Sequence, residues 1–373
     1  MLLGFAISAA FCRAQLELRV AEQFQTRLGH RPDLFILGVM LMGLFLSMWV
    51  NNHTAPIVCI AFLTPILQDF GKDSRFAKAL LLGLTVACNL GGMLTPIASI
   101  HNALTVAALG AAGIDVSFGE WLLVAGPIAL LGTSLAWYAL LTVEKPNDVR
   151  EIPTVIYDKQ PLGALHWTVL VGTTLTVAML AAMPFITSVI GGVPVLALLY
   201  LTVMFSLNVL TVLDFNSFNW HMIILLGGGS VLGDAVASSH LLELISSGVL
   251  AALGGPMYVQ YCLIVFVMII VASCVSHTVG ALILMPLLVQ LGLRLQAPVS
   301  LTLSCAFAIS AAMALPFSSF PNLNILTVRS ETGAPFIKPH DIMRRGLPMT
   351  FVLYFLIVTV GYGALQVFIP DRS

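Results

Sequence analysis

The sequence contains very little charge. Only 9% of its 373 residues are Asp, Glu, Lys or Arg, whereas 59% are hydrophobic, and soluble domains carry roughly a quarter charged residues. A soluble protein of this length could not cover its surface with so few charged side chains. The composition therefore excludes an ordinary soluble protein and predicts an all-α integral membrane protein, for which lipid is the solvent of most of the surface.

Several function classes also lack their sequence signals. The net charge of −1 provides no basic face for nucleic acid, and the six cysteines form no CxxC motif or His-Cys cluster. The sequence has no HExxH motif, no P-loop and no paired carboxylates inside an apolar segment, which argues against a membrane-embedded enzyme and an ATP-driven pump. We therefore expect a non-enzymatic membrane protein without an organic cofactor.

The chain opens with the apolar run MLLGFAISAAF and then becomes polar. This run has no basic n-region and no A-x-A cleavage site, so it does not fit a signal peptide. We interpret it as the end of a membrane span, and we expect that the chain is an N-terminally truncated product.

Four apolar stretches are interrupted where a simple membrane span would be continuous. Residues 34–68 and 257–293 each divide into two short apolar segments around a polar run, Asn-Asn-His-Thr in the first and Ser-His-Thr in the second. We expect two re-entrant hairpins with polar tips at membrane depth. Residues 78–112 and 299–328 each contain a polar interruption with proline, and there we expect two broken helices.

The other segments predict two halves of the chain. The first half, 1–143, would also hold an interfacial helix at 13–31 and a span at 121–143, and a polar linker at 144–164 would separate it from the second half, 165–373. The further elements predicted in the second half are an interfacial helix at 239–254 and spans at 166–188, 192–213, 220–237 and 347–369.

The distribution of Lys and Arg orients this topology. Only two of the 16 Lys and Arg residues, Arg294 and Arg372, fall in the loops on one side. By the positive-inside rule, the opposite side is cytoplasmic. The first hairpin then enters the membrane from the cytoplasm and the second from outside. The cytoplasmic segments are 13–31, 69–78, 144–164, 212–219 and 329–346.

One motif, P-x-x-S-x-x-N, occurs twice, as PIASIHN ending at Asn102 and as PFSSFPN ending at Asn322, at an offset of 220 residues. The hairpin tips match at a similar offset of 224, between Asn52 and Ser276. The shared order and spacing predict two structural repeats. Because the two hairpins enter from opposite sides, the repeats are inverted, which is the plan of many secondary transporters.

The interruptions suit a small anion. Backbone groups without partners cost several kcal/mol each in hydrocarbon, so interrupted helices persist only inside protein or around a wet cavity. Helix N-termini at such a cavity carry about half a positive charge each, which suits phosphate, sulfate or a dicarboxylate, and freed carbonyls could bind Na⁺. The neutral polar residues at the interruptions are Asn51, Asn52, His53, Thr54, Ser99, Asn102, Ser276, His277, Thr278, Ser318, Ser319 and Asn322.

Three residues have two interpretations each. Asp234, in the predicted span 220–237, is either a helix-end residue at the interface or part of a proton relay. His53 and His277 either contact substrate or only donate a hydrogen bond to a freed carbonyl. A titratable histidine at the site could also favour H⁺ coupling.

At these positions the chain resembles the divalent anion:sodium symporter family. Its members carry Ser-Asn-Thr at each hairpin tip, where this sequence has Asn51-Asn52-His53 and Ser276-His277-Thr278. The family run G-G-x-x-T-x-x-G-x-P-P-N is similar to GGMLTPIASIHN here, and L-P-x-A-T-P-P-N is similar to LPFSSFPN. Where the sequence departs from these family motifs, it resembles the membrane part of the fungal low-affinity phosphate transporters. The segments SMWVNNHTAP and VSHTVGALILMPL resemble the same proteins. The resemblance covers nearly the whole chain.

The resemblance implies a secondary transporter of inorganic phosphate or a related divalent anion that is coupled to Na⁺ or H⁺. It also implies a homodimer with an elevator motion, and further spans before this stretch. Substrate contacts would come from Asn52, His53, Ser99, Ser276, His277, Thr278 and Ser319. Na⁺ contacts would come from Asn51, Asn52, Ala98, Ser276, His277 and Ser318, supported by Pro96, Asn102, Pro316 and Asn322.

Two alternatives stay open. One is a sodium-coupled dicarboxylate or sulfate carrier, and the other is an anion channel or receptor on the same scaffold. The sequence is compatible with the plasma membrane and with a vacuole-like organelle.

Overall fold

The computed structural model of the chain is helical. It describes residues 2–16, 26–50, 52, 54–152, 163–182, 186, 191–218, 220, 224, 254–275 and 277–369. Within these ranges, the only β-type pairing is an isolated bridge between Arg329 and Pro335. The fold class predicted from composition is therefore confirmed at the level of an all-helical membrane protein.

The helices follow the predicted segments closely. In chain order they are α1 (Leu2–Arg13), α3 (Pro32–Val50), α4 (Thr54–Leu67), α5 (Arg75–Gly91), α6 (Ile100–Ala111), α7 (Phe118–Glu144), α8 (Ala164–Ala181), α10 (Val193–Ser206), α11 (Val212–Asn216), α14 (Met257–Cys274), α15 (His277–Arg294), α16 (Pro298–Ala311), α17 (Phe320–Ile325), α18 (Pro339–Leu356), the π-helix η1 (Ile357–Gly361) and α19 (Tyr362–Phe368).

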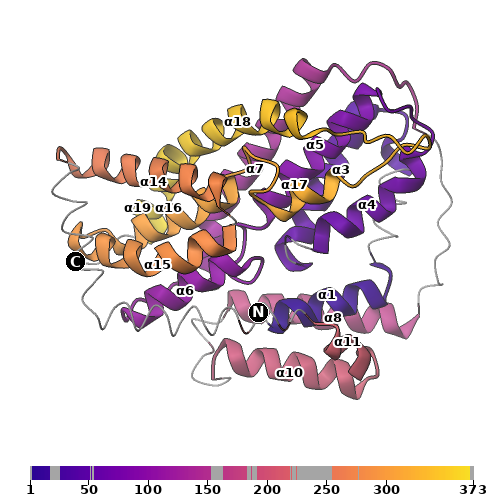
Figure 1. The fold of residues 1–373 in the computed structure, drawn as a ribbon. Helices are drawn as coiled ribbons and strands as arrows, with labels where there is room; N and C mark the ends of the chain where they lie inside the picture. Colours follow the sequence, from indigo (N-terminus) through magenta and orange to yellow (C-terminus); the bar gives the residue numbers. More distant parts are fainter. Residues whose placement is uncertain are drawn as a thin grey trace.

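The helices form two bodies that lie side by side. Figure 1 shows α1, α8, α10 and α11 gathered beneath a larger body that contains α3 to α7 and α14 to α19. In the smaller body, Thr173 of α8 and Tyr200 of α10 share a hydrogen bond of 3.1 Å, and Phe5 of α1 contacts Phe218 with ring centroids 6.0 Å apart. The smaller body meets the larger one where α1 packs on α3 and α8 packs on α7.

Two helices form the centre of the larger body. Every residue of α16 is buried, and so is nearly all of α5. Helix α16 has no charged residue, and the charged residues of α5, Arg75 and Lys78, lie in its first turn, as expected for helices surrounded by other helices. The small hydroxyl residues of α16 bond to its neighbours, for example Ser304 to the hydroxyl of Tyr261 at 2.6 Å, which is a common way for membrane helices to pack closely.

Helix α3 approaches α5 closely because glycines line their contact. A side chain at Gly91 would collide with the backbone carbonyl of Leu44 and would lie 2.8 Å from the Cβ of Ser47. The Ser47 hydroxyl donates to the carbonyl of Cys88 at 2.7 Å, across the same contact. Small residues therefore fix α3 against the C-terminal end of α5.

Three loops that the sequence assigns to the cytoplasm come together at one end of the larger body. Residues 69–74, 148–151, 332 and 334 line one hollow. The Asp148 carboxylate accepts from the Ser74 hydroxyl and from the backbone N–H groups of Arg75 and Phe76, at 2.7 to 3.0 Å, so it stabilises the N-terminus of α5. The segment before α3 is also near this linker, since the Ile152 N–H donates to the carbonyl of Gly29 at 3.0 Å.

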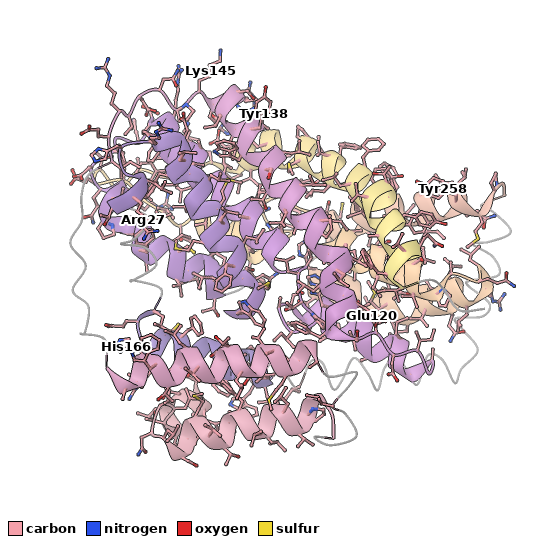
Figure 2. All side chains as sticks on the ribbon, turned by 180° about the vertical axis from the view of Figure 1, so that it is seen from behind. Arg27, Glu120, Tyr138, Lys145, His166 and Tyr258 are labelled. Atoms are coloured by element: carbon pink, nitrogen blue, oxygen red, sulfur yellow. The ribbon has the colours of Figure 1, made fainter. Side chains whose placement is uncertain are left out.

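Five helical stretches among the described residues are long and apolar enough to cross a membrane. Together with the other apolar helices, they make this a multi-pass integral membrane protein. Figure 2 shows α7 running through the larger body, with Glu120 near one end and Lys145 at the other. The five stretches are Pro32–Trp49, Phe118–Glu144, Met257–Cys274, His277–Arg294 and Pro339–Phe368.

Some predicted boundaries differ from the structure. The last helix begins at Pro339 rather than 347, because its polar first turns are capped by Asp341 while its apolar part lies further on. The predicted span at 192–213 ends at Ser206, where Asn208 takes a positive φ of 54° and stops the helix. Nearly all of the helix predicted at 239–254 and of the span at 220–237, with Asp234, lies outside the described residues.

Candidate functional site

The two broken helices are interrupted at matching positions. Helix α5 ends at Gly91 and α6 begins at Ile100, whereas α16 ends at Ala311 and α17 begins at Phe320. We call residues 92–99 break 1 and residues 312–319 break 2. The breaks coincide when one is shifted by 220 positions, which is the offset of the sequence motif.

In break 1, Asn102 replaces the missing helical hydrogen bonds. Its side-chain NH₂ donates to the carbonyl of Gly92 at 2.8 Å and to the carbonyl of Thr95 at 2.7 Å. The Ser99 hydroxyl also donates to Gly92 at 3.0 Å, and the indole N–H of Trp121 donates to Met93 at 2.8 Å. The carbonyls released by the break are therefore satisfied inside the protein, as a buried interruption requires.

In break 2, Asn322 occupies the equivalent position and makes equivalent bonds. Its side-chain NH₂ donates to the carbonyl of Met313 at 3.2 Å and to the carbonyl of Leu315 at 2.8 Å. The Ser318 hydroxyl also donates to Leu315 at 2.8 Å. Ser99 and Ser319 both have extended backbone at the N-cap of the following helix, with φ of −149° and −137°. The two breaks therefore share the pair of asparagine hydrogen bonds and the sequence motif, while their serine bonds differ, since Ser99 donates to Gly92 and Ser318 donates to Leu315.

Each helix pair places its tip against one break. The backbone N–H of Asn52, between α3 and α4, donates to the carbonyl of Ala98 in break 1 at 3.2 Å. The Asn52 side chain lies against Gly92, where any added Cβ would be 2.9 Å from the Asn52 Cβ. His277, at the start of α15, donates through Nε2 to the carbonyl of Ala312 in break 2 at 3.0 Å.

The two breaks are also joined to each other. His101, in the first turn of α6, places Nε2 2.7 Å from the Ser310 hydroxyl at the end of α16 and 3.1 Å from the Ser99 hydroxyl. Its ring meets the ring of His277 edge-on, with centroids 5.7 Å apart. On the other side, the Asn89 amide donates to the side-chain oxygen of Asn322 at 3.4 Å. Polar groups from both tips and both breaks thus form one connected cluster.

The electrostatics of this cluster come from backbone and neutral side chains. Neither break contains a charged residue. Helices α4, α6, α15 and α17 all begin at a tip or a break, so their N-terminal N–H groups are oriented toward it. Such N-termini favour an anion at the site without any Lys or Arg.

Buried amide oxygens in the same cluster are suited to a cation, whereas the helix N-termini are suited to an anion. Asn52, Asn89 and Asn102 each have a side-chain oxygen that is buried and has no hydrogen-bond partner among the described residues. Asn52 and Asn102 both contact Gly92 in break 1. Oxygen atoms of amides and carbonyls are the ligands that hard cations such as Na⁺ take, so the residues around break 1 fit a bound cation.

Most of the predicted site residues lie in this cluster. Asn52, Ser99, Asn102, Ala98, His277, Thr278, Ser318, Ser319 and Asn322 are all buried. Pro96 and Pro316 lie within the two breaks and are partly buried. Asn51, His53 and Ser276, which were also predicted to contact substrate or Na⁺, lie outside the described residues.

Several members of the cluster were not predicted from the sequence. His101 lies inside the quoted motif and occupies a position where the family run has proline, so that departure was a usable signal. Ser310, Asn89 and Trp121 lie outside the motifs. Their part in the cluster depends on how α16, α5 and α7 pack, and no local pattern indicates it.

Comparisons with known proteins agree on one family. The family model described as the sodium:sulfate symporter transmembrane region matches residues 1–368. The chain is 30% identical to the low-affinity phosphate transporter PHO90 of Saccharomyces cerevisiae over 90% of the chain, and it spans only 38% of that protein's length. It is 24% identical to the sodium-dependent dicarboxylate transporter SdcS of Staphylococcus saprophyticus over 86% of the chain and 68% of that protein.

The fold has a counterpart of known structure. The YdaH transporter of Alcanivorax borkumensis superposes on this chain with a TM-score of 0.68 and 14% sequence identity. The match covers 100% of this chain and 85% of the other. At this level of identity the comparison supports the fold alone.

Proposed function

This chain belongs to the sodium:sulfate symporter family, and from that premise we propose that it works as a secondary transporter of inorganic phosphate or a related divalent anion. The observation that carries the proposal is the matched pair of breaks, in which Asn102 and Asn322 hold two interrupted helices in the same way. The described part of the cluster offers neutral hydrogen-bonding groups and no carboxylate, which suits the binding and release of an anion.

Phosphate as the substrate rests on two supports. The resemblance to PHO90 extends over 90% of the chain, and the polar cluster offers hydroxyl, amide and helix N-terminal donors without a basic side chain. Phosphate has several acceptor oxygens and binds readily to such donors. In the proposed site, Asn52, Ser99, His277, Thr278 and Ser319 contact the substrate, together with His53 and Ser276.

We propose that the two halves, 1–143 and 165–373, are inverted repeats joined by the 144–164 linker. The tip at Asn52 contacts Ala98, which lies at the interruption between α5 and α6. The contact is therefore partway along the broken helix and not at the far end of α6. His277 contacts Ala312 at the equivalent place. These contacts favour tips that end at membrane depth, so α3–α4 and α14–α15 would be re-entrant hairpins that enter from opposite sides.

Coupling to Na⁺ is supported by the family and by the buried amide oxygens of Asn52 and Asn102. In the proposed first cation site, these oxygens act with Asn51 and the backbone of Ala98. In the second, Ser276, His277 and Ser318 contribute. Because the Nε2 of His277 already donates to the carbonyl of Ala312, a cation there would have to replace that hydrogen bond, and coupling to H⁺ is the alternative at this half of the site.

The separation into two bodies is compatible with an elevator motion in a homodimer. The polar cluster lies entirely within the larger body, which meets the smaller body through α1, α7, α8 and α3. In this proposal the larger body carries the substrate across the membrane, while α1, α8, α10 and α11 belong to a static scaffold.

A sodium-coupled carrier of dicarboxylate or sulfate is the second candidate. It is favoured by the name of the family model and by the 24% identity to SdcS. The same neutral donor set could bind either class of anion. Substrate competition separates the two candidates.

The test is uptake of labelled phosphate into proteoliposomes that contain the chain, competed by sulfate, succinate and citrate, with the Na⁺ and pH gradients imposed separately. The proposal predicts saturable uptake that unlabelled phosphate inhibits more strongly than succinate or citrate. A Na⁺ gradient should stimulate uptake more than a pH gradient. Stronger inhibition by succinate than by phosphate would replace phosphate with a dicarboxylate as the substrate.

Two variants test the site. Asn52→Ala and Ser319→Ala should abolish phosphate uptake, because each removes a polar group from a tip or a break, while insertion and purified yield stay normal. Asn216→Ala, which changes an exposed residue of α11, is the matched control and should transport normally. Normal uptake by both site variants would refute the assignment of these residues.

A further inference from the structure

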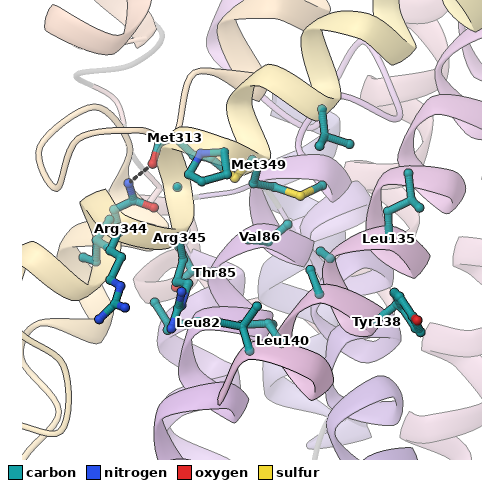
Figure 3. A pocket seen from close by; sticks show the side chains of 18 residues that line it. Leu82, Thr85, Val86, Leu135, Tyr138, Leu140, Met313, Arg344, Arg345 and Met349 are labelled. Carbon is teal, nitrogen blue, oxygen red and sulfur yellow. Dashed lines mark hydrogen bonds between the residues drawn. The ribbon is translucent and has the colours of Figure 1, made fainter. Parts of the chain in front are cut away.

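A cavity beside the polar cluster opens between α5, α7 and α18. Its volume is about 320 Å³, which lies in the size range of small-molecule sites. Figure 3 shows Leu82, Val86, Leu135, Met349 and other apolar side chains around it. Most of the cavity is therefore suited to a hydrocarbon chain, and the polar groups of its lining, such as Arg344, Arg345 and Asn322, are few.

One end of the cavity carries two arginines. The Arg345 guanidinium forms an ion pair with Glu144 at the end of α7, and both side chains are largely shielded. Arg344 is exposed and makes no ion pair with any described residue. One positive charge is thus neutralised inside the protein, and one remains available at the mouth of the cavity.

The mouth lies on an apolar outer surface. Tyr138 of α7 is 66% exposed, and Leu347 and Phe351 of α18 are 53% and 45% exposed. Figure 1 shows α18 on the side of the larger body that faces away from α1, α8 and α10. In a multi-pass membrane protein such a face contacts lipid, and the cluster of Lys and Arg at the same end is the cytoplasmic side by the positive-inside rule.

We propose that this cavity binds an anionic phospholipid of the cytoplasmic leaflet. Its acyl chain would lie along α7 and α18, and its phosphate would contact Arg344. Arginine binds phosphate oxygens in a bidentate manner, and a basic residue beside an apolar groove at the membrane surface matches both parts of such a lipid. The inference uses the proposed orientation in the membrane, but it does not depend on which anion is transported.

The cavity also reaches break 2. Met313 and Asn322 line its inner end, and the dashed line in Figure 3 marks the hydrogen bond of 3.2 Å between them. On α18, Gly346 packs directly against the Met313 carbonyl. A lipid chain in the cavity would therefore press on the helix contact that fixes break 2, so its occupancy should change the rate of transport.

The direct test is native mass spectrometry of the delipidated chain, titrated with dioleoylphosphatidylserine or with dioleoylphosphatidylcholine. We expect one tightly bound phosphatidylserine and markedly weaker binding of phosphatidylcholine. Arg344→Gln should weaken phosphatidylserine binding about fivefold, since one basic contact at a membrane surface contributes roughly this much. Lys145→Gln, which removes an exposed cation at the same end but outside the cavity lining, is the control and should bind normally.

Two further variants keep the test decisive. Ala139→Phe fills the cavity but leaves both arginines, so it should remove the bound lipid without changing the charge. Glu144→Gln releases Arg345 and should strengthen phosphatidylserine binding.

Equal binding of the two lipids by the wild-type chain would overturn the proposal, and so would equal effects of Arg344→Gln and Lys145→Gln. Occupation of this face by a second copy of the chain, detected as a dimer that Ala139→Phe dissociates, would also overturn it. None of these readouts requires transport, so failure of the phosphate proposal would be seen separately.

Discussion

Two asparagines hold the interrupted helices in the same way. Asn102 and Asn322 each donate two hydrogen bonds to carbonyls that a continuous helix would have satisfied. An interruption in a buried helix is costly unless such donors are present. At the residue scale, these two side chains are what allows non-helical backbone to persist beside the proposed site.

Replacing either asparagine by alanine should therefore reduce stability. We expect Asn102→Ala and Asn322→Ala to lower the free energy of unfolding by about 1–3 kcal/mol, the usual cost of buried polar groups that lose their partner. The loss is limited because Ser99 and Ser318 still donate to Gly92 and Leu315. Thermal unfolding in detergent measures the effect, with Asn216→Ala as the exposed control, and equal stability of all three variants would contradict this account.

The residues of the breaks were predictable because the chain repeats their motif. Ser99 and Asn102 recur as Ser319 and Asn322, and prolines mark both interruptions. The hydrogen bond from Asn89 to Asn322 and the bridge from His101 to Ser310 were not predictable. They join residues more than 200 positions apart through helix packing, which a single sequence does not encode locally.

At the scale of elements, the contact between α3 and α5 positions the first tip. Gly91 is the last residue of α5, and the carbonyl of Leu44 occupies the space that a side chain there would need. The same contact contains the bond from Ser47 to Cys88. The distance between these helices therefore determines where Asn52 meets Ala98.

A methyl group at Gly91 should disturb the first tip. Gly91→Ala forces α3 away from α5, and we expect it to cost about 1–3 kcal/mol of stability, as overpacking does, and to reduce phosphate uptake severalfold. Gly110→Ala on α6 is the matched control, because no atom lies within 4 Å of its added Cβ, and it should be neutral or slightly stabilising. If both variants behaved alike, the close helix contact would not be what positions the tip.

The presence of each helix was easier to predict from the sequence than the residues at which the helix begins and ends. The apolar segments around 34–68 and 257–293 each correspond to a pair of helices: α3 ends at Val50 and α4 begins at Thr54, and α14 ends at Cys274 and α15 begins at His277. The start of α18 was placed too late, because polar residues such as Arg344 and Arg345 follow the helix cap and still continue the helix. Hydropathy detects the membrane-facing part of a helix and misses a polar extension beyond it.

At the scale of the whole molecule, the loops rich in Lys and Arg gather at one end. Residues 69–74, 148–151, 332 and 334 line a common hollow there. The turn that contains Asp115 precedes α7, whose other end at Glu144 leads into this hollow, and the turn that contains Gln296 precedes α16, whose other end is break 2. This arrangement is what inverted repeats require of their loops.

Cysteine labelling tests that arrangement. In a background with Cys12, Cys262 and Cys274 changed to serine, Lys72→Cys and Glu331→Cys should react with an impermeant maleimide only from the cytoplasmic side. Asp115→Cys and Gln296→Cys should react only from outside, and all four positions are exposed. Reaction of Lys72→Cys and Glu331→Cys from opposite sides would be incompatible with the proposed topology.

The central claim is that this chain carries phosphate through a site formed by two matched breaks. Counterflow in proteoliposomes tests it most directly, because only a carrier exchanges internal for external substrate. Preloading with unlabelled phosphate should accelerate uptake of labelled phosphate several-fold in the wild-type chain and in Asn216→Ala, and should have no effect in Asn52→Ala. Absence of acceleration in a wild-type chain that binds phosphate would contradict the claim and would favour a receptor or channel.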